Sequence, residues 1–534
     1  MSLLNSTISF LEQPNILKVF KALFALSLGY FAFILFHYHY YLITFPYPII
    51  YREGAMMAST AKLLHGINPY NFLLEPQYTN GYGLVYPLAV LPFASLLGVS
   101  LVVHRALTGF FILSSCAIIF FVLSRKKTPV LLNLWATLTL YASLLFPLTS
   151  TPCVDPAATG LFFMLLTIFI PFFLNYSYLS LGVSIICGFL AFYTKTYFLL
   201  GMPVMASYLF LFISKKKSIF YGFCCLAFFS FSVFVTDHFF PSYFDDCFFI
   251  NYNISDRFGW TFVLIRQLHR YADLHVGIII LLSLVFIYTL VRLIMSASIK
   301  SVKNILKGSL NSIQWKNWNG PLITSQLPLD IYAGICFAAV LLISMGKHFG
   351  ANLWYFFQLF SPFLASFVAW GTGRFKLWPI FFSFLLIYNL FILTRDDNYK
   401  YFDKNVAGWH EVEMLIKSKA IIFNSSLIAP LLIQENKEIY DDGTDFYAEG
   451  SKRSGFLGRF FHEDNRVNMA QSLYFNKVHS MIEYKKFDLI MIEAGYPGDV
   501  IPKNVSNYYK YIGSILVNVP QDRRPYLMTV WRPN

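Results

Sequence analysis

Long apolar segments recur along residues 1–395, and each is long enough to cross about 30 Å of hydrocarbon as a helix. Hydrocarbon offers no partners to backbone N–H and C=O groups, so a spanning segment has to pair them within itself, as a helix does. The sequence therefore predicts an all-α polytopic membrane domain over residues 1–395, with about eleven transmembrane helices. They are expected near residues 18–43, 101–123, 129–148, 157–174, 178–194, 197–213, 218–236, 274–295, 330–345, 352–370 and 376–394.

The composition excludes a soluble globular protein. Of the 534 residues, 57% are hydrophobic and only 13% are charged, which leaves too little polar surface for a water-exposed globule of this size. The first apolar segment, about 25 residues from Val19, is longer than the core of a signal peptide and lacks a small-residue cleavage site. It is therefore expected to remain as a membrane anchor.

The cations predict which way the chain crosses the membrane. The net charge is +13, but the lysines and arginines stand in short clusters between apolar segments, which is typical of positive cytoplasmic loops. The basic charge therefore predicts a cytoplasmic N-terminus and does not imply a nucleic-acid partner. The clusters that then share the cytoplasmic side are Lys18 with Lys21, residues 125–127, residues 215–217, residues 300–316, and Arg374 with Lys376.

The carboxylates fall mostly on the opposite, extracytoplasmic side. Only ten acidic residues precede position 396, and eight of them lie in segments that this topology places outside. Polar chemistry is therefore expected at the outer face. The eight residues are Glu53, Glu75, Asp155, Asp237, Asp245, Asp246, Asp256 and Asp273.

Two outer segments are predicted to have structure of their own. In the first outer loop, residues 44–100, the stretches AMMASTAKLLHG and LVYPLAVLPFASLLG predict two helices that lie in the membrane interface. Residues 396–534 are ordinary in polarity, and the β-rich runs AIIFNSS, FDLIMIEA, GSILVNV and YLMTVW alternate there with helical or turn segments. This tail is therefore predicted to be a small soluble α/β domain on the extracytoplasmic side.

The seven cysteines have no CxxC spacing and lie mostly inside apolar segments, which is typical of small buried hydrophobic residues. Only Cys153 and Cys247 fall in predicted loops. A disulfide between these two is the minor alternative to free thiols.

Four motifs on the predicted outer side, taken in order, resemble a known family. The first loop has YREG, AKLLHGINPY and NGYGLVYPL, and it is followed by TPCVDPAATGL, FYTKTYFLL and GKHFGANLWYF. Together they resemble the GT-C superfamily of membrane glycosyltransferases, in particular glycosyltransferase family 39, which holds the protein O-mannosyltransferases and the lipid A aminoarabinose transferases. The resemblance covers residues 18–394. Within it, Glu53 stands where many relatives have Asp, Thr196 replaces Gln, and Asn352 comes two places early.

The resemblance implies an integral-membrane enzyme that transfers a hexosyl or pentosyl group, with inversion, at the extracytoplasmic face. The donor would be a polyprenyl-phosphate sugar, or a pyrophosphate one, and the acceptor a glycolipid, a polysaccharide or a protein. Similarity to bacterial members favours the bacterial inner membrane, and the endoplasmic reticulum is the alternative. No cofactor is implied as required, and a divalent metal, Mg²⁺ or Mn²⁺, held by Glu53 and Asp155 is an alternative.

Two carboxylates are the candidates for the reaction itself. Such a transfer needs a base that takes the acceptor's proton and cations that stabilise the departing phosphate. The resemblance implies that Glu53, directly after the first apolar segment, is this general base; a solvated carboxylate paired with Arg52 is the alternative. Asp155 either belongs to the same site or only caps the N-terminus of the next helix.

Cations at outer helix ends are the candidates for binding the donor's phosphate. Lys195 and Lys347 stand there, and His348 and the loop residue Arg257 are further candidates. The alternatives are snorkelling lysines, an accommodated histidine and a salt-bridged loop. Tyrosines can present aromatic faces and hydroxyls to a sugar, although a chain with 35 of them places some near a site by chance. The substrate-binding candidates are Tyr70, Tyr82, Tyr86 and Asn352.

Other classes of protein remain open from the sequence. A transporter or lipid flippase has a similar number of spans, but it should carry ionisable residues at mid-membrane or broken helices at matching places in two halves. An interaction scaffold would account for the tail but not for the clustered outer charges. A transferase like the O-antigen ligases would concentrate Arg and His in a large late loop, whereas the large outer loop here comes first.

Overall fold

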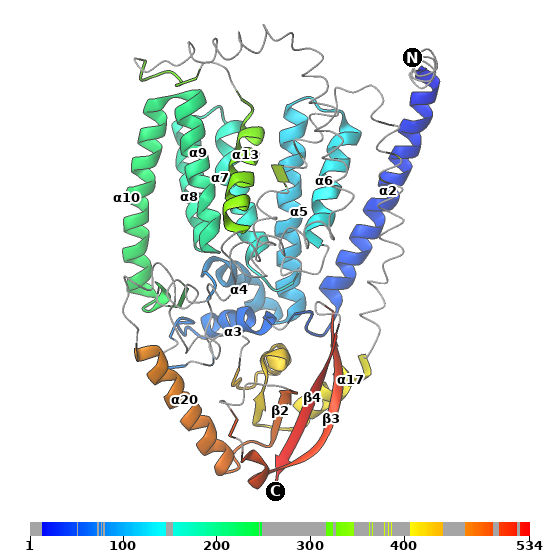
Figure 1. Cartoon of the computed structure of the whole chain (residues 1–534), viewed down its shortest axis with the longest axis vertical. Helices are drawn as coiled ribbons and strands as arrows, with labels where there is room; N and C mark the ends of the chain where they lie inside the picture. The colour runs from blue at the N-terminus through cyan, green and yellow to red at the C-terminus, as the bar shows by residue number, and fades with distance from the viewer. Residues whose placement is uncertain are drawn as a thin grey trace.

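The computed structural model of the chain is mostly helical, with one small sheet (Figure 1). It describes residues 13–50, 52–71, 81–145, 153–244, 317–323, 327–345, 406–441, 465–494, 504–520 and 524–534, together with scattered residues between these ranges. The predicted spans near 274–295, 352–370 and 376–394 lie outside the described residues, apart from single positions.

The other predicted spans are helices whose bounds agree with the predicted ranges to within a few residues. Helix α7 packs against both α5 and α8, and residues 196–213 form one helical segment in three parts. The helices are α2 (Pro14–Thr44), α5 (Leu101–Arg125), α6 (Val130–Leu145), α7 (Ala157–Phe173), α8 (Tyr178–Phe192), η2 (Thr196–Leu200), α9 (Gly201–Tyr208), η3 (Leu209–Ile213), α10 (Lys215–Phe239) and α13 (Leu329–Met345).

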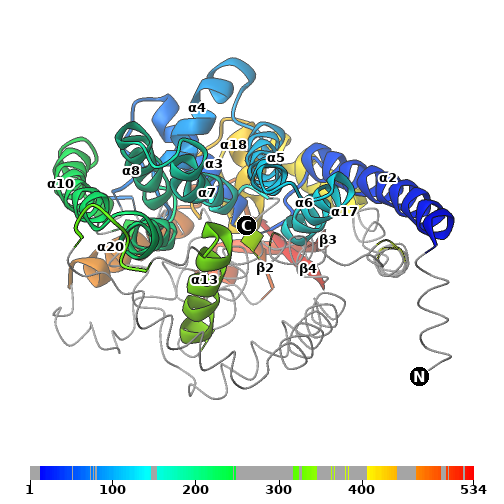
Figure 2. The same cartoon turned by 90° about the horizontal axis from the view of Figure 1, so that it is seen from above.

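Four of the described helical segments are long and apolar enough to cross a membrane: α2, α5, residues 196–213 and α10. Shorter apolar helices lie between them. Helices α2 and α10 lie at opposite edges of the described bundle (Figure 2), and on α10 Phe223 and Leu226 are each 71% exposed. Such an apolar surface is unfavourable in water and suits hydrocarbon, which is what a multi-pass membrane protein requires.

The basic helix ends lie together at one end of the bundle. Arg125 Nη1 donates to the Phe173 carbonyl (2.8 Å), and Lys217 Nζ donates to the Tyr176 carbonyl (2.7 Å). The basic clusters at the end of α5 and at the start of α10 therefore share one end, as the sequence predicts. Helix α2 also begins at this end (Figure 1).

The predicted first outer loop contains the two predicted helices, α3 (Glu53–Leu64) and α4 (Val85–Leu97), which cross the other end of the bundle (Figure 1). Helix α4 fits a membrane interface, because Leu96 and Leu97 are 82% and 71% exposed. Helix α3 differs from α4 in being covered by protein: its residues from Glu53 to Thr60 are all buried. The reason is that the C-terminal tail packs on α3 from the side opposite the bundle.

The tail forms a small α/β unit around a four-stranded sheet in the order β1-β2-β4-β3. Strand β1 pairs with β2 in parallel, and β4 pairs in antiparallel fashion with both β2 and β3. All four strands coincide with the predicted β-rich runs. The elements are α17 (Val406–Ser418), β1 (Ile422–Asn424), η6 (Ser426–Ile428), α18 (Ala429–Gln434), α20 (Asn465–Glu483), β2 (Leu489–Glu493), η7 (Val505–Asn507), β3 (Tyr509–Val519) and β4 (Arg524–Pro533).

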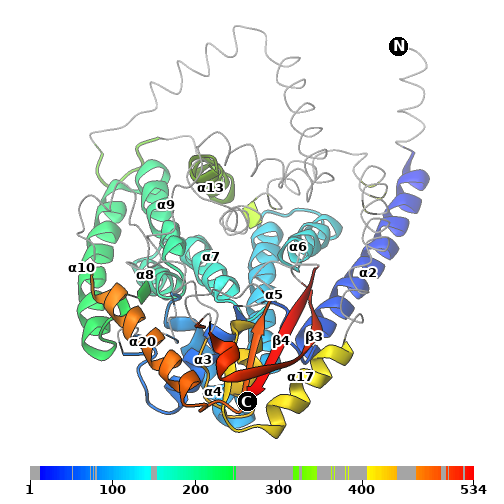
Figure 3. The same ribbon diagram turned by 60° about the horizontal axis from the view of Figure 1, so that its bottom comes forward.

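The central strand β2 begins with three residues, Leu489–Met491, that are buried on both faces of the sheet, which explains their apolar sequence. In β2, Leu489 and Met491 belong to the core that continues into the helical bundle, whereas Ile490 belongs to a second core filled by Tyr474 and Val478 of α20. The first core runs from the bundle through α17 and α18 into the sheet. The tail therefore shares its core with the end of the bundle that it covers (Figure 3).

The seven cysteines all lie within the described residues as free thiols, so the alternative of a Cys153–Cys247 disulfide is wrong. Both side chains are buried. Burial raises the pKa of the Cys153 thiol well above its ordinary value, and the negative charge of Glu53 adds to this. A thiol in this environment stays protonated and unreactive.

Candidate functional site

Glu53, the predicted base, is the first residue of α3 and is 0% exposed. Its carboxylate forms a bidentate ion pair with Arg105 of α5: Nε donates to Oε1 and Nη2 donates to Oε2, each at 2.8 Å. The Ile49 N–H donates to Oε2 at 2.7 Å, and the Val154 N–H donates to Oε1 at 3.1 Å. Each oxygen thus accepts two hydrogen bonds, which fills the acceptor sites of a carboxylate.

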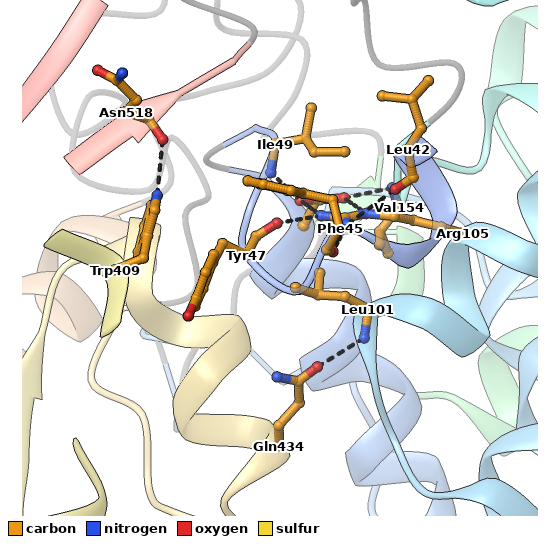
Figure 4. A network of polar contacts seen from close by, with 11 residues as sticks. Leu42, Phe45, Tyr47, Ile49, Leu101, Arg105, Val154, Trp409, Gln434 and Asn518 are labelled. Carbon is orange, nitrogen blue, oxygen red and sulfur yellow. Dashed lines mark hydrogen bonds and ion pairs between the residues drawn. The ribbon is translucent and has the colours of Figure 1, made fainter. Parts of the chain in front are cut away.

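The N–H donors of the Arg105 guanidinium are also all used in hydrogen bonds. Its Nη1 donates to the carbonyls of Leu42 (3.3 Å) and Phe45 (2.5 Å), and its Nη2 also donates to the Tyr47 carbonyl (2.8 Å). With the two bonds to Glu53, these contacts use all five N–H donors of a guanidinium. The pair therefore ties the end of α2 and the chain that follows it to the starts of α3 and α5 (Figure 4).

This network gives Glu53 a structural role in the described conformation. All lone pairs of the Glu53 carboxylate accept hydrogen bonds, so none is left for a proton or a metal ion. The ion-pair partner of Glu53 is Arg105 and not Arg52, which the sequence suggested as the alternative to a catalytic role. Sequence reasoning did not single out Arg105. The signal was nevertheless present, because an arginine inside an apolar segment is costly enough to demand a partner.

Asp155 and Lys195 form a second buried ion pair, between the turn before α7 and the turn after α8. Lys195 Nζ donates to Asp155 Oδ1 at 2.8 Å and to Oδ2 at 3.2 Å, while the Ala157 N–H donates to Oδ1 at 2.7 Å. Asp155 thus caps the first turn of α7 and also stands among the other site candidates, next to the Val154 N–H that binds Glu53. Unlike the oxygens of Glu53, Oδ2 of Asp155 retains an acceptor position.

The Tyr82 side chain contacts two cations, Lys195 and Arg52. Lys195 Nζ lies 4.6 Å from the centre of the Tyr82 ring, a cation–π distance, and Arg52 Nη1 donates to Tyr82 Oη at 3.3 Å. The Tyr82 carbonyl accepts a hydrogen bond from the Tyr70 hydroxyl at 3.0 Å. Burial raises the pKa of Tyr70 well above its ordinary value, so this hydroxyl remains a neutral donor.

Gly83 allows the loop segment that carries Tyr82 to reach Lys195. The Gly83 N–H donates to the Thr194 carbonyl at 3.1 Å, and the Val85 N–H donates to the Tyr193 carbonyl at 3.0 Å. A Cβ on Gly83 would lie 1.9 Å from the Tyr193 carbonyl oxygen, which is far inside contact distance. The glycine therefore permits a close backbone approach to the turn that presents Lys195.

Tyr86 completes the set of candidates that the structure brings together. Its hydroxyl donates to the His104 carbonyl at 3.3 Å and lies 3.2 Å from Thr108 Oγ1, and the side chain is fully buried. The carboxylates of Glu53 and Asp155 are near enough to act on it electrostatically. The predicted residues that meet at this end of the bundle are Glu53, Tyr70, Tyr82, Tyr86, Asp155 and Lys195. The candidates Lys347, His348, Arg257 and Asn352 lie outside the described residues.

A divalent metal does not fit the two carboxylates as they stand. Glu53 is neutralised by Arg105 and Asp155 by Lys195, so neither carboxylate has the uncompensated negative charge that attracts Mg²⁺ or Mn²⁺. Among the residues that the structure describes, no group of three or more His, Cys, Asp and Glu side chains is placed to hold a metal ion.

Comparison of the chain with protein-family models, with curated proteins and with solved structures gives no match. The likeness to GT-C transferases therefore depends on the sequence motifs alone.

Proposed function

We propose that the chain is an integral-membrane, inverting glycosyltransferase of the GT-C type, which moves a sugar from a polyprenyl-phosphate donor to an acceptor at the extracytoplasmic face. The observation that carries the proposal is the meeting of outer motifs that lie far apart in the sequence. Residues 52–53, 81–86, 153–155 and 193–195 form one polar cluster at the end of an apolar bundle. That cluster holds carboxylates and cations, which are the parts that such a transfer requires.

Lys195 and Arg52 supply positive charge for the donor's phosphate. The phosphate gains negative charge as its bond to the sugar breaks, and cations aimed at it lower the barrier. Both cations contact Tyr82, one through the ring and the other through the hydroxyl. Lysine is a compact charge on a flexible stem, so Lys195 can turn from Asp155 to a phosphate without a movement of the backbone.

Asp155 is better placed than Glu53 to act as the base. In a single displacement, the acceptor oxygen bonds to the anomeric carbon, the bond from that carbon to the phosphate oxygen breaks, and the acceptor's proton passes to a carboxylate. Oδ2 of Asp155 has an acceptor position for this proton, whereas both oxygens of Glu53 are fully used. The general base is therefore Asp155 and not Glu53, for which the sequence predicted this role. Glu53 instead holds Arg105 and the first loop in place.

The test is transfer by the purified, reconstituted protein from a panel of radiolabelled polyprenyl-phosphate sugars, with glycolipid, polysaccharide and peptide acceptors, and with and without EDTA. Asp155→Asn should lower turnover about 100-fold or more and leave donor affinity near wild type. Lys195→Gln should weaken donor binding about tenfold or more. Lys62→Gln is the matched control, since Lys62 pairs with Glu75 in the same loop, and it should change neither quantity.

Each other outcome changes the proposal in a defined way. Loss of turnover in Glu53→Gln, with its melting temperature intact, would return the role of base to Glu53. Loss of transfer in EDTA would require a metal ion. Donor binding with movement across the vesicle membrane but no transfer would favour a lipid flippase, and no binding of any donor would contradict the proposal.

A further inference from the structure

His104, in the first turn of α5, is a buried polar side chain whose hydrogen bonds the fold does not satisfy. The ring is 0% exposed. Within the part of the chain that the structure describes, neither Nδ1 nor Nε2 has a hydrogen-bond partner. Native proteins keep few such groups, because an unpaired buried donor or acceptor is destabilising, and each one calls for an explanation.

The neighbours of His104 place it beside the transfer site. The next residue, Arg105, holds Glu53, and the His104 ring packs against Tyr86 with 5.8 Å between the ring centroids. The Tyr86 hydroxyl, on which the Asp155 and Glu53 charges act, donates to the His104 carbonyl. The unsatisfied ring is therefore part of the same cluster as the predicted site residues.

A second unsatisfied group lies on the neighbouring helix. Thr159 is in the first turn of α7, which packs against α5 and begins just after Asp155. Its hydroxyl is also buried without a partner among the described residues. Both helices thus carry neutral hydrogen-bonding groups at this end that their own packing leaves unused.

We propose that His104 is a ligand-binding residue of the site and that a hydroxyl group of the donor's sugar completes its hydrogen bonds; this inference rests on the proposed function. A neutral imidazole has one N–H donor and one nitrogen acceptor, and a sugar hydroxyl is both an acceptor and a donor. The two groups therefore match without any net charge. Because the ring is fully buried in this conformation, the sugar reaches it when the segments that cover it shift.

The first arm of the test needs no transfer. His104→Leu removes both nitrogens and keeps an apolar side chain of similar reach. If the ring serves a ligand, the protein without ligand melts at the same temperature or higher, because an unpaired polar group has been removed. His39 is the matched control: it is another buried histidine of the bundle, and its Nε2 also lacks a partner among the described residues, but its Nδ1 lies 2.5 Å from the Tyr141 hydroxyl. Because His39→Leu removes that hydrogen bond, it should lower the melting temperature.

The second arm uses donors that each lack one sugar hydroxyl. With the wild-type protein, the donor that lacks the hydroxyl bound by His104 should react about tenfold more slowly than the parent donor. With His104→Leu these two donors should react alike, while His39→Leu should keep the wild-type discrimination per folded protein. This loss of discrimination is a readout that a purely structural histidine would not give.

The outcomes separate this inference from the proposed function. A fall in the melting temperature of His104→Leu without ligand, or unchanged discrimination among the deoxy donors, would overturn the role of His104 while transfer by the wild type upheld the enzyme. If the wild type transfers nothing, the proposed function fails. In that case the rise in melting temperature that the parent donor causes is measured for the wild type and for His104→Leu. An equal rise in both proteins, or no rise in the wild type, would overturn the inference too.

Discussion

Removing one member of the Glu53–Arg105 pair leaves the other as a buried charge, surrounded by groups that are aligned for its partner. Arg105→Leu is therefore expected to lower the free energy of unfolding by about 3–5 kcal/mol. Glu53→Gln should also be destabilising, because the buried Arg105 guanidinium stays charged and a single amide oxygen cannot accept all four hydrogen bonds. Thermal unfolding in detergent measures both, and a wild-type melting temperature for Arg105→Leu would contradict the network.

Gly83 is the second residue whose change has a defined result. A Cβ at this position meets the Tyr193 carbonyl oxygen at 1.9 Å, so the loop has to move away from the turn before Lys195. Gly83→Ala should lower the free energy of unfolding by about 1–3 kcal/mol and weaken donor binding. Gly182→Ala in α8, where a Cβ meets no atom within 4 Å, is the control and should leave both near wild type. Equal donor affinities in the two variants would show that the loop around Tyr82 does not need Gly83 to approach the turn before Lys195.

At the residue scale, the sequence predicts which residues lie close together where the membrane restricts their positions. Asp155, Lys195 and Tyr82 each stand at a helix end on the predicted outer side, and residues confined to one end of a bundle have few places to be. The sequence does not predict which charged group pairs with the Glu53 carboxylate. Whether Glu53 meets Arg52, a metal ion or Arg105 depends on how α5 packs against α2 and α3, and no spacing in the sequence encodes that distance.

At the scale of elements, the two helices of the first loop show what an apolar pattern leaves undecided. Helices α3 and α4 are both short and apolar, and both were predicted where the structure has them. A small apolar helix, however, is equally compatible with burial against lipid and with burial against protein. The tail covers α3 and leaves the end of α4 exposed, and this difference depends on residues that follow more than 300 positions later.

Helix α17 docks on the chain after α2 through Tyr47. The Tyr47 ring stacks on Trp409 with 5.5 Å between centroids and 9° between planes. Its hydroxyl donates to Glu413 Oε2 at 3.2 Å and lies 2.9 Å from His410 Nδ1. Since the Tyr47 carbonyl accepts from Arg105, the position of α17 is connected to the buried Glu53–Arg105 pair by a single residue.

This docking should weaken in acid. The hydrogen bond from Lys417 lowers the pKa of Glu413 below its ordinary value of 4.5, and the Tyr47 hydroxyl adds to the effect. A carboxylate with a lowered pKa in the folded state stabilises the fold above its unfolded pKa and loses that contribution as the pH falls through the folded value. Wild-type protein should therefore lose melting temperature below pH 4.5 more steeply than Glu413→Gln. Parallel curves for the two proteins would contradict this.

At the scale of the whole molecule, the loop and the tail should be accessible from the same side of the membrane. Leu74 in the first loop and Tyr484 in the tail are 78% and 74% exposed, whereas Lys127 lies at the opposite end. A membrane-impermeant maleimide added to intact cells should label Leu74→Cys and Tyr484→Cys, and should label Lys127→Cys only after permeabilisation. Opposite labelling of Leu74→Cys and Tyr484→Cys would contradict the arrangement of loop and tail.

The boundary between membrane domain and tail is the whole-molecule feature that the sequence predicts least well. The change in polarity near residue 396 and the four strands are both readable from the sequence, because strand periodicity is local. The contact between tail and bundle is not, because it is made by single residues such as Trp409 and Glu413, which look like ordinary core and surface residues of the α/β unit. A sequence-based division into two domains therefore misses the core that they share.

The contact between Tyr47 and His410 joins positions 363 residues apart. A ribosome that adds about 5–20 residues per second needs about 20 to 70 s to make that stretch. Throughout this interval α3 lacks the cover of η6 and α18, which follow α17 in the chain and pack on α3 in the finished molecule. Chaperones and proteases at that end of the bundle therefore have access to apolar residues of α3 that are buried in the finished molecule. A nascent chain that stalls before Trp409 would carry a lasting degradation signal that the completed chain lacks.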